Sequence, residues 1–158
     1  MPLKIRDVMV KNVFTVDVDS TAKHAAKIMN RCEIGSLIVL ENGAVAGIVT
    51  ERDMLRKIID GGRDPEKTMV REIMSRPVIV VSPETPLEEA VTLMVKYKIK
   101  KLPVMERIKG EERLVGLVTL TDIARFQPKL METLKELFAK EREIPPKRME
   151  KVINYYIV

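Results

Sequence analysis

The stretch Gly47–Asp53 reads GIVTERD, and it returns 69 positions later as GLVTLTD at Gly116–Asp122. In both copies an apolar run of strand type stops at a threonine, and a helix-like segment follows from the aspartate. The sequence therefore predicts the same strand-to-helix corner twice. Because each corner carries a hydroxyl and a carboxylate, it is the first place to look for function.

The duplication extends outward from these corners. Residues 6–9 match residues 71–74 at an offset of 65, and the apolar faces of the helices predicted over 22–29 and 87–94 match at the same offset. The offset then grows to 69 because the hairpin loop at 106–113 is four residues longer than its counterpart. A genuine duplication tolerates an insertion in a turn. Each repeat therefore reads as strand, helix, strand, strand, helix.

We expect an α/β (α+β) fold in which two such repeats pack in pseudo-twofold symmetry. The first repeat spans 1–62, a polar linker spans 63–68, the second repeat spans 69–126, and a C-terminal helical extension spans 127–158. A unit of about 60 residues would be only marginally stable alone, because it buries a smaller fraction of its surface than a larger domain does. The two repeats should therefore share an interface, with both corners in the cleft between them.

Composition narrows the class of protein. The 158 residues are 46% hydrophobic and carry a net charge of +5, but basic and acidic residues are interleaved. This charge allows an anionic partner without selecting among small phosphates, acidic proteins and nucleic acid. The single Cys32 cannot form an intramolecular disulfide, and neither a signal peptide nor an apolar run of about 20 residues is present. We therefore expect a cytoplasmic protein without a membrane segment, and the low Gln content is typical of thermophiles.

The chain resembles a tandem pair of CBS domains, the regulatory module named after cystathionine β-synthase and also called a Bateman module. The resemblance rests on Gly-hydrophobic-hydrophobic-Thr-x-x-Asp in both repeats and covers residues 5–126. It implies a stand-alone CBS pair that binds AMP, ADP or ATP as a regulatory ligand in the inter-repeat cleft, needs no other cofactor, and reports to an effector protein that the sequence does not identify. S-adenosylmethionine is the alternative ligand. The family often forms homodimers, and we expect one here.

The two corners have the chemistry that a nucleoside requires. A carboxylate accepts two hydrogen bonds from the vicinal hydroxyls of a ribose, and a neighbouring threonine adds a hydroxyl contact. Because each corner opens a helix, its backbone N–H groups and dipole suit a phosphate. The candidate ribose-binding residues are Thr50 and Asp53 in the first copy and Thr119 and Asp122 in the second, and the candidate phosphate-neutralising residues are Arg52, Lys100 and Lys101.

The resemblance also implies an apolar slot for the adenine, lined by the first strand of each repeat and the start of the second. Gly35 and Ser36 stand where the second copy has Lys100 and Lys101, and Thr121 replaces Arg52, so we expect the two pockets to bind phosphate unequally. The residues of the slot and its edges are Val13, Thr15, Ile34, Gly35, Ser36, Val78, Val80, Ile99 and Pro103, the last of which has Ile38 as its counterpart.

Each of these assignments has a simpler alternative. Thr50–Asp53 reads equally well as a capping box that closes a helix start, and Lys100 with Lys101 as a solvated turn. His24 has no partner cluster, so we assign it a structural or surface role. No nucleophile with its base, metal cluster or Walker-type loop is found, which disfavours an enzyme. The alternative function is a transcription-linked adaptor whose C-terminal tail touches protein or nucleic acid.

Overall fold

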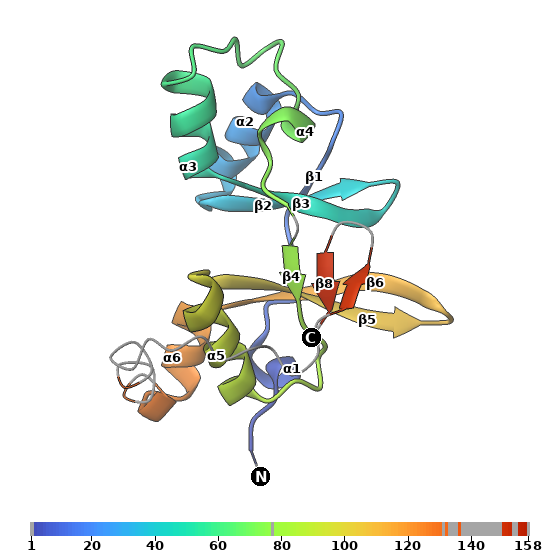
Figure 1. Cartoon of the computed structure of the whole chain (residues 1–158), viewed down its shortest axis with the longest axis vertical. Helices are drawn as coiled ribbons and strands as arrows, with labels where there is room; N and C mark the ends of the chain where they lie inside the picture. Colours follow the sequence, from blue (N-terminus) through green and yellow to red (C-terminus); the bar gives the residue numbers. More distant parts are fainter. Residues whose placement is uncertain are drawn as a thin grey trace. The chain divides into compact units, whose positions relative to one another are not determined.

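The computed structural model describes residues 2–76, 78–130, 132, 136, 150–152 and 155–157 (Figure 1). The chain forms two compact units. Among the described residues, the repeat-1 unit contains 14–76 and 78 together with 151, 152, 155 and 156, and the repeat-2 unit combines 2–13 with those of 79–150 and with 157. The prediction of mixed α/β repeats is confirmed, whereas an interface shared by the two repeats stays a prediction.

The repeat-1 unit is a three-stranded sheet covered by helices. Strand β1 runs parallel to β2, and β2 runs antiparallel to β3 through a turn at Asn42 and Gly43, both of which have positive φ. Small residues on one face of α2, Ala22 and Ala25, are fully buried, which lets this helix pack closely on the core. Its elements are β1 (Thr15–Asp17), α2 (Ala22–Cys32), β2 (Ser36–Glu41), β3 (Ala44–Thr50), α3 (Glu51–Asp53), the π-helix η1 (Met54–Ile59) and α4 (Val70–Ile73).

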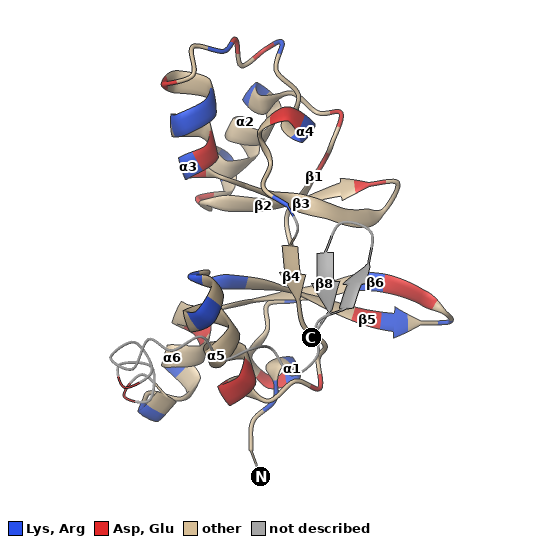
Figure 2. Cartoon of the chain, in the orientation of Figure 1, with Lys and Arg blue, Asp and Glu red and all other residues tan. Residues whose placement is uncertain are grey.

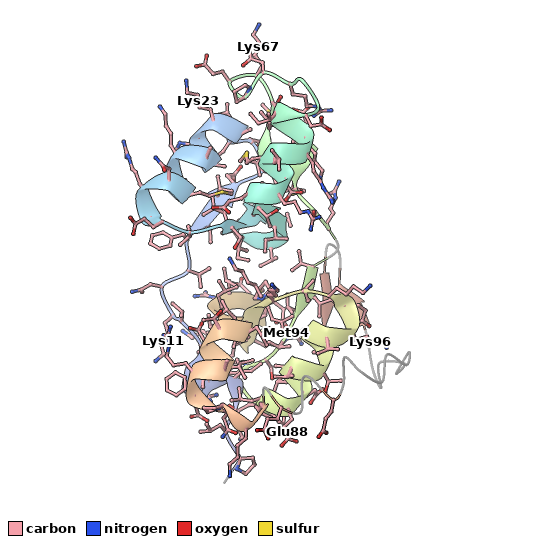
Figure 3. The ribbon with its side chains drawn as sticks, turned by 90° about the vertical axis from the view of Figure 1, so that its left-hand side faces the viewer. Lys11, Lys23, Lys67, Glu88, Met94 and Lys96 are labelled. Carbon is pink, nitrogen blue, oxygen red and sulfur yellow. The ribbon has the colours of Figure 1, made fainter. Side chains whose placement is uncertain are left out.

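The repeat-2 unit repeats this plan. Strands β5 and β6 form a longer antiparallel hairpin, and Val81 makes a parallel bridge to Val104 where β1 meets β2 in the other unit. Figure 3 shows Met94 of α5 inside this unit, while Glu88 of the same helix lies at its surface. Its elements are α1 (Ile5–Val8), α5 (Leu87–Tyr97), β5 (Lys101–Ile108), β6 (Glu111–Thr119) and α6 (Leu120–Phe126).

The C-terminal segment differs from the prediction of a helical extension over 127–158. Strands β7 (Glu150–Val152) and β8 (Tyr155–Ile157) form a three-stranded sheet with β4 (Val78–Val80) in the order β4-β8-β7, so the prediction is wrong at those residues. The β-branched and aromatic residues of this ending favour strands. Leu130 is buried in the core of the repeat-2 unit. The other apolar positions of the predicted helix, at 134, 137 and 138, lie outside the described residues.

The two units exchange their opening helices. Ile5 and Val8 of α1 belong to the core of the repeat-2 unit, and Val70 and Ile73 of α4 belong to the core of the repeat-1 unit. The compact units are therefore divided after residues 13 and 78, whereas the predicted boundaries at 62 and 69 follow the sequence repeat.

A duplicated arginine anchors each exchanged helix. Arg71 donates to Asp19 at 2.8 Å and to Glu41 at 3.2 Å, and Arg6, 65 positions earlier, pairs with Glu84 and Glu106, each 65 positions after those two carboxylates. The hydrogen bond that Arg71 donates to Asp19 is the main cause of the raised pKa of Arg71. The pKa of Glu84 is lowered by hydrogen bonds from Lys4 and Arg6.

Candidate ligand-binding corners

The first corner, Thr50–Asp53, lies where β3 passes into α3. Thr50 Oγ1 accepts a hydrogen bond from Asp53 N at 3.2 Å, and Asp53 Oδ2 accepts from Thr50 N at 2.9 Å and from Thr50 Oγ1 at 3.0 Å. The capping-box interpretation of this corner is therefore confirmed. The Asp53 side chain is largely buried, with 10% of its surface exposed.

The other oxygen of Asp53 has further partners in the same unit. Lys57 Nζ lies 3.2 Å from Asp53 Oδ1, and Ser75 Oγ donates to the same oxygen at 3.4 Å. Lys57 Nζ also donates to the carbonyl oxygen of Ile73 at 2.7 Å. We call this set of contacts, centred on Lys57 and completed by Ser75, the Lys57 lock. It ties the first corner to the end of α4.

The second corner, Thr119–Asp122, lies where β6 passes into α6. Thr119 Oγ1 accepts from Asp122 N at 3.1 Å and donates to Asp122 Oδ2 at 2.8 Å. The nearest cation to Asp122 Oδ1 in the described part of the chain is Arg125, at 4.0 Å on a side chain that is 71% exposed. The two corners thus share a capping geometry and differ in what surrounds the carboxylate.

The sequence explains this difference at two positions. Phe126 stands 69 positions after Lys57, and Val10 stands 65 positions before Ser75, so the second copy has neither the ammonium nor the hydroxyl of the Lys57 lock. The sequence motifs alone single out neither Lys57 nor Ser75. The spacing of Asp53 and Lys57, at i and i+4, is the signal that could have found the lysine.

The glycine that begins each corner motif has a structural role. A Cβ on Gly47 would lie 2.8 Å from the Ser75 carbonyl oxygen, and a Cβ on Gly116 would lie 2.8 Å from Met9 Sδ and 3.0 Å from the Val10 carbonyl oxygen. At both places the strand forms an antiparallel bridge to the segment that follows the exchanged helix. The missing side chain therefore lets that segment approach the strand leading to the corner.

The strand beside each corner brings further predicted site residues close to it. The sheet register pairs Ser36 with Thr50 and Lys101 with Thr119. The carbonyls of Gly35 and Lys100 accept the first helical N–H after each threonine, at 3.0 Å and 2.8 Å. These N–H groups are already used, which reduces the donors left for a phosphate at either helix start.

The remaining predicted site residues divide between the two units. Val13 belongs to the first sequence repeat but lies in the unit of the second corner. Val78 belongs to the second repeat but lies in the unit of the first corner. Arg52 and Thr121 occupy equivalent exposed positions, one on each corner helix. With the first corner lie Thr15, Ile34, Gly35, Ser36 and Val78, and with the second lie Val13, Val80, Ile99, Lys100, Lys101 and Pro103.

Charge is also distributed unequally. Figure 2 shows basic residues at the start of β5, where Lys100 is exposed and Lys101 is half-buried. Within the described ranges, no three His, Cys, Asp or Glu side chains gather closely enough to hold a metal ion. No helix in that part of the chain has the length and apolar character needed to cross a membrane.

Comparison with known proteins agrees with the duplicated architecture. The family model of the CBS domain matches residues 5–60 and 70–129. CBS domain-containing protein YhcV of Bacillus subtilis is 34% identical over 120 residues, which cover 76% of this chain and 82% of that protein. The solved CBS domain pair of protein MJ0100, in complex with 5′-methylthioadenosine and S-adenosyl-L-methionine, has a TM-score of 0.70 and 27% identity, and the match covers 82% of this chain and 99% of that one. Hypoxic Response Protein I, solved with two coordinated zinc ions, has a TM-score of 0.70 and 30% identity, with 79% and 99% covered. The chain belongs to the CBS domain family and carries two copies of that domain.

Proposed function

We propose that this CBS pair is a regulatory module that binds an adenosine-containing ligand through a Thr/Asp corner and catalyses no reaction. The observation that carries the proposal is the corner itself, in which a threonine hydroxyl lies beside an aspartate carboxylate in both repeats. This pair of groups suits the vicinal hydroxyls of a ribose. The similar CBS pair of MJ0100 was solved with two adenosine derivatives, which supports the same ligand class here.

The charge beside the second corner favours a phosphorylated ligand. Lys101 lies opposite Thr119 in the hairpin register, and Lys100 precedes it. The positive charges of these two lysines attract the phosphates of AMP, ADP or ATP and oppose the positive sulfonium of S-adenosylmethionine. We therefore rank an adenine nucleotide above S-adenosylmethionine. We further expect the module to act in the cytoplasm as a homodimer and to signal to an effector protein.

Calorimetric titration of the whole chain tests the proposal. AMP, ATP and S-adenosylmethionine are titrated separately, and we expect a dissociation constant of about 1 µM, or roughly −8 kcal/mol, for a nucleotide. Binding of AMP and ATP should weaken as salt is raised, because the lysines contribute through charge. The absence of binding and of any ligand-induced change in melting temperature with all three compounds would overturn the proposal.

A second arm addresses the adaptor alternative. Retention of DNA is measured at low and moderate salt, with and without the nucleotides. Electrostatic binding to DNA falls steeply with salt. Strong DNA retention at moderate salt that does not change when nucleotides are added would favour the transcription-linked adaptor.

A further inference from the structure

We infer that the ligand diol binds at the second corner alone, and that the Lys57 lock makes the first corner a structural element. The inference rests on the proposed function, because it assumes a ligand that presents two vicinal hydroxyls. The question is which of the two similar corners can accept hydrogen bonds from these hydroxyls. The two aspartate carboxylates differ in how many acceptor positions remain open to such a ligand.

An ionised carboxylate offers about four lone-pair positions on its two oxygens. In Asp53, Oδ2 accepts from the backbone and the hydroxyl of Thr50, and Oδ1 faces Lys57 and Ser75. Three hydrogen bonds from Thr50 and Ser75 therefore occupy the carboxylate within the unit, and the ammonium of Lys57 lies 3.2 Å from Oδ1, where it covers the remaining position. A diol can bind this carboxylate only by displacing some of these partners.

Displacing Lys57 is unfavourable for a second reason. Its ammonium also donates to the Ile73 carbonyl at 2.7 Å, so it is held from two sides. Hydrogen bonds of a charged group are stronger than those between neutral groups. A ligand hydroxyl that replaces the ammonium can still donate to the carboxylate, but the ion pair of Lys57 with Asp53 and the hydrogen bond of Lys57 to the Ile73 carbonyl are lost. The first corner therefore favours the lysine over the sugar.

At the second corner, fewer acceptor positions of the carboxylate have partners among the described residues. Asp122 Oδ2 accepts from the Thr119 hydroxyl, and Oδ1 faces Arg125 at 4.0 Å, beyond hydrogen-bond distance. The exposed fraction of the Asp122 side chain is 17%, compared with 10% for Asp53. A diol needs two acceptor positions, and this carboxylate can provide them without breaking a charged contact.

The experiment measures stoichiometry by calorimetry with AMP and ATP as probes, on the full chain. We expect one ligand per chain, loss of binding in Asp122→Asn, and a change of less than about threefold in Asp53→Asn, which converts to under 0.7 kcal/mol. Lys57→Met keeps the aliphatic stem and removes the ammonium, and it should raise the stoichiometry toward two. The matched variant Val10→Ser with Phe126→Lys copies the lock into the second corner and should weaken binding at least about tenfold.

The outcomes separate the two claims. Two ligands per wild-type chain, or loss of binding in Asp53→Asn with Asp122→Asn unaffected, would overturn the inference while leaving the proposed function intact. If no probe binds any variant, the proposed function fails, and the lock is judged from stability alone. In that case Asp53→Asn should lower the melting temperature by several degrees and Asp122→Asn by less than about 2 °C. Equal decreases would overturn the lock as well.

Discussion

Replacing Gly47 with alanine tests how tightly the exchanged segment after α4 is held against β3. A Cβ at this position would lie 2.8 Å from the Ser75 carbonyl oxygen and 2.9 Å from Met74 Sδ. The methionine side chain can move, but the carbonyl accepts from Ile48 N at 3.1 Å, and Ser75 N donates back to Ile48 O at 2.8 Å. The added methyl group must therefore push the two backbones apart.

The size of the effect follows from these contacts. Overpacking a close-packed site costs about 1–3 kcal/mol. Each backbone hydrogen bond contributes about 0.5–1.5 kcal/mol, and two of them are strained by the separation. Because the same movement relieves the clash and weakens the bonds, the two costs overlap rather than add. We expect the free energy of unfolding to fall by about 2 kcal/mol, close to the middle of both ranges.

Urea denaturation measures this loss. With a slope of about 2 kcal/mol per molar, the midpoint should fall by about 1 M without a change in slope. Gly35→Ala is the matched control, because the nearest atoms to its added Cβ belong to the exposed Glu51 carboxylate at 3.4 Å. That midpoint should stay within about 0.2 M of the wild type. An unchanged midpoint in Gly47→Ala, or an equal fall in both variants, refutes the packing argument.

Three further predictions concern the repeat-2 unit. Ile5→Ala should lower the free energy of unfolding by about 2–5 kcal/mol in urea, because Ile5 is fully buried in this core, and an effect below 1 kcal/mol would contradict the exchange of α1. Thr119→Val removes the N-cap of α6 and should lower the melting temperature by about 2–4 °C, whereas an unchanged value would deny the cap a stabilising role. Lys4 and Arg6 lower the pKa of Glu84, so its contribution to stability is present above its unfolded pKa and is lost as pH falls through the folded pKa. Glu84→Gln should therefore lower the urea midpoint at pH 7 but not in strong acid, and an equal loss at both pH values would exclude the charge as its cause.

The corners are the part of the molecule that sequence predicts best. Threonine and aspartate recur at a fixed spacing after an apolar run, and this local pattern is enough to specify a strand that ends at an N-cap. The structure confirms that geometry in both copies. The helix faces of α2 and α5 are predicted for the same reason, since burial follows the spacing of apolar residues along one helix.

The exchange of α1 and α4 could not be predicted in this way. Both helices have the same short pattern, so local sequence specifies a helix and leaves open which sheet it covers. That choice depends on contacts between distant residues, such as Met74 with Gly47. The Lys57 lock depends on it too, because the Ile73 carbonyl and the Ser75 hydroxyl reach the first corner only when α4 packs in the repeat-1 unit.

The exchange also sets an order of events while the chain is being synthesised. Val10 bonds to Leu117, which the ribosome adds roughly a hundred residues later, so at about 5–20 residues per second the wait is on the order of 5–20 s. Throughout that time Ile5 and Val8 have no core to enter, whereas residues 16–74 can already form the core of the repeat-1 unit with α4 included. Helix α1 is therefore made long before the core that covers it, and a chaperone that shields nascent apolar segments has a clear target in residues 5–8.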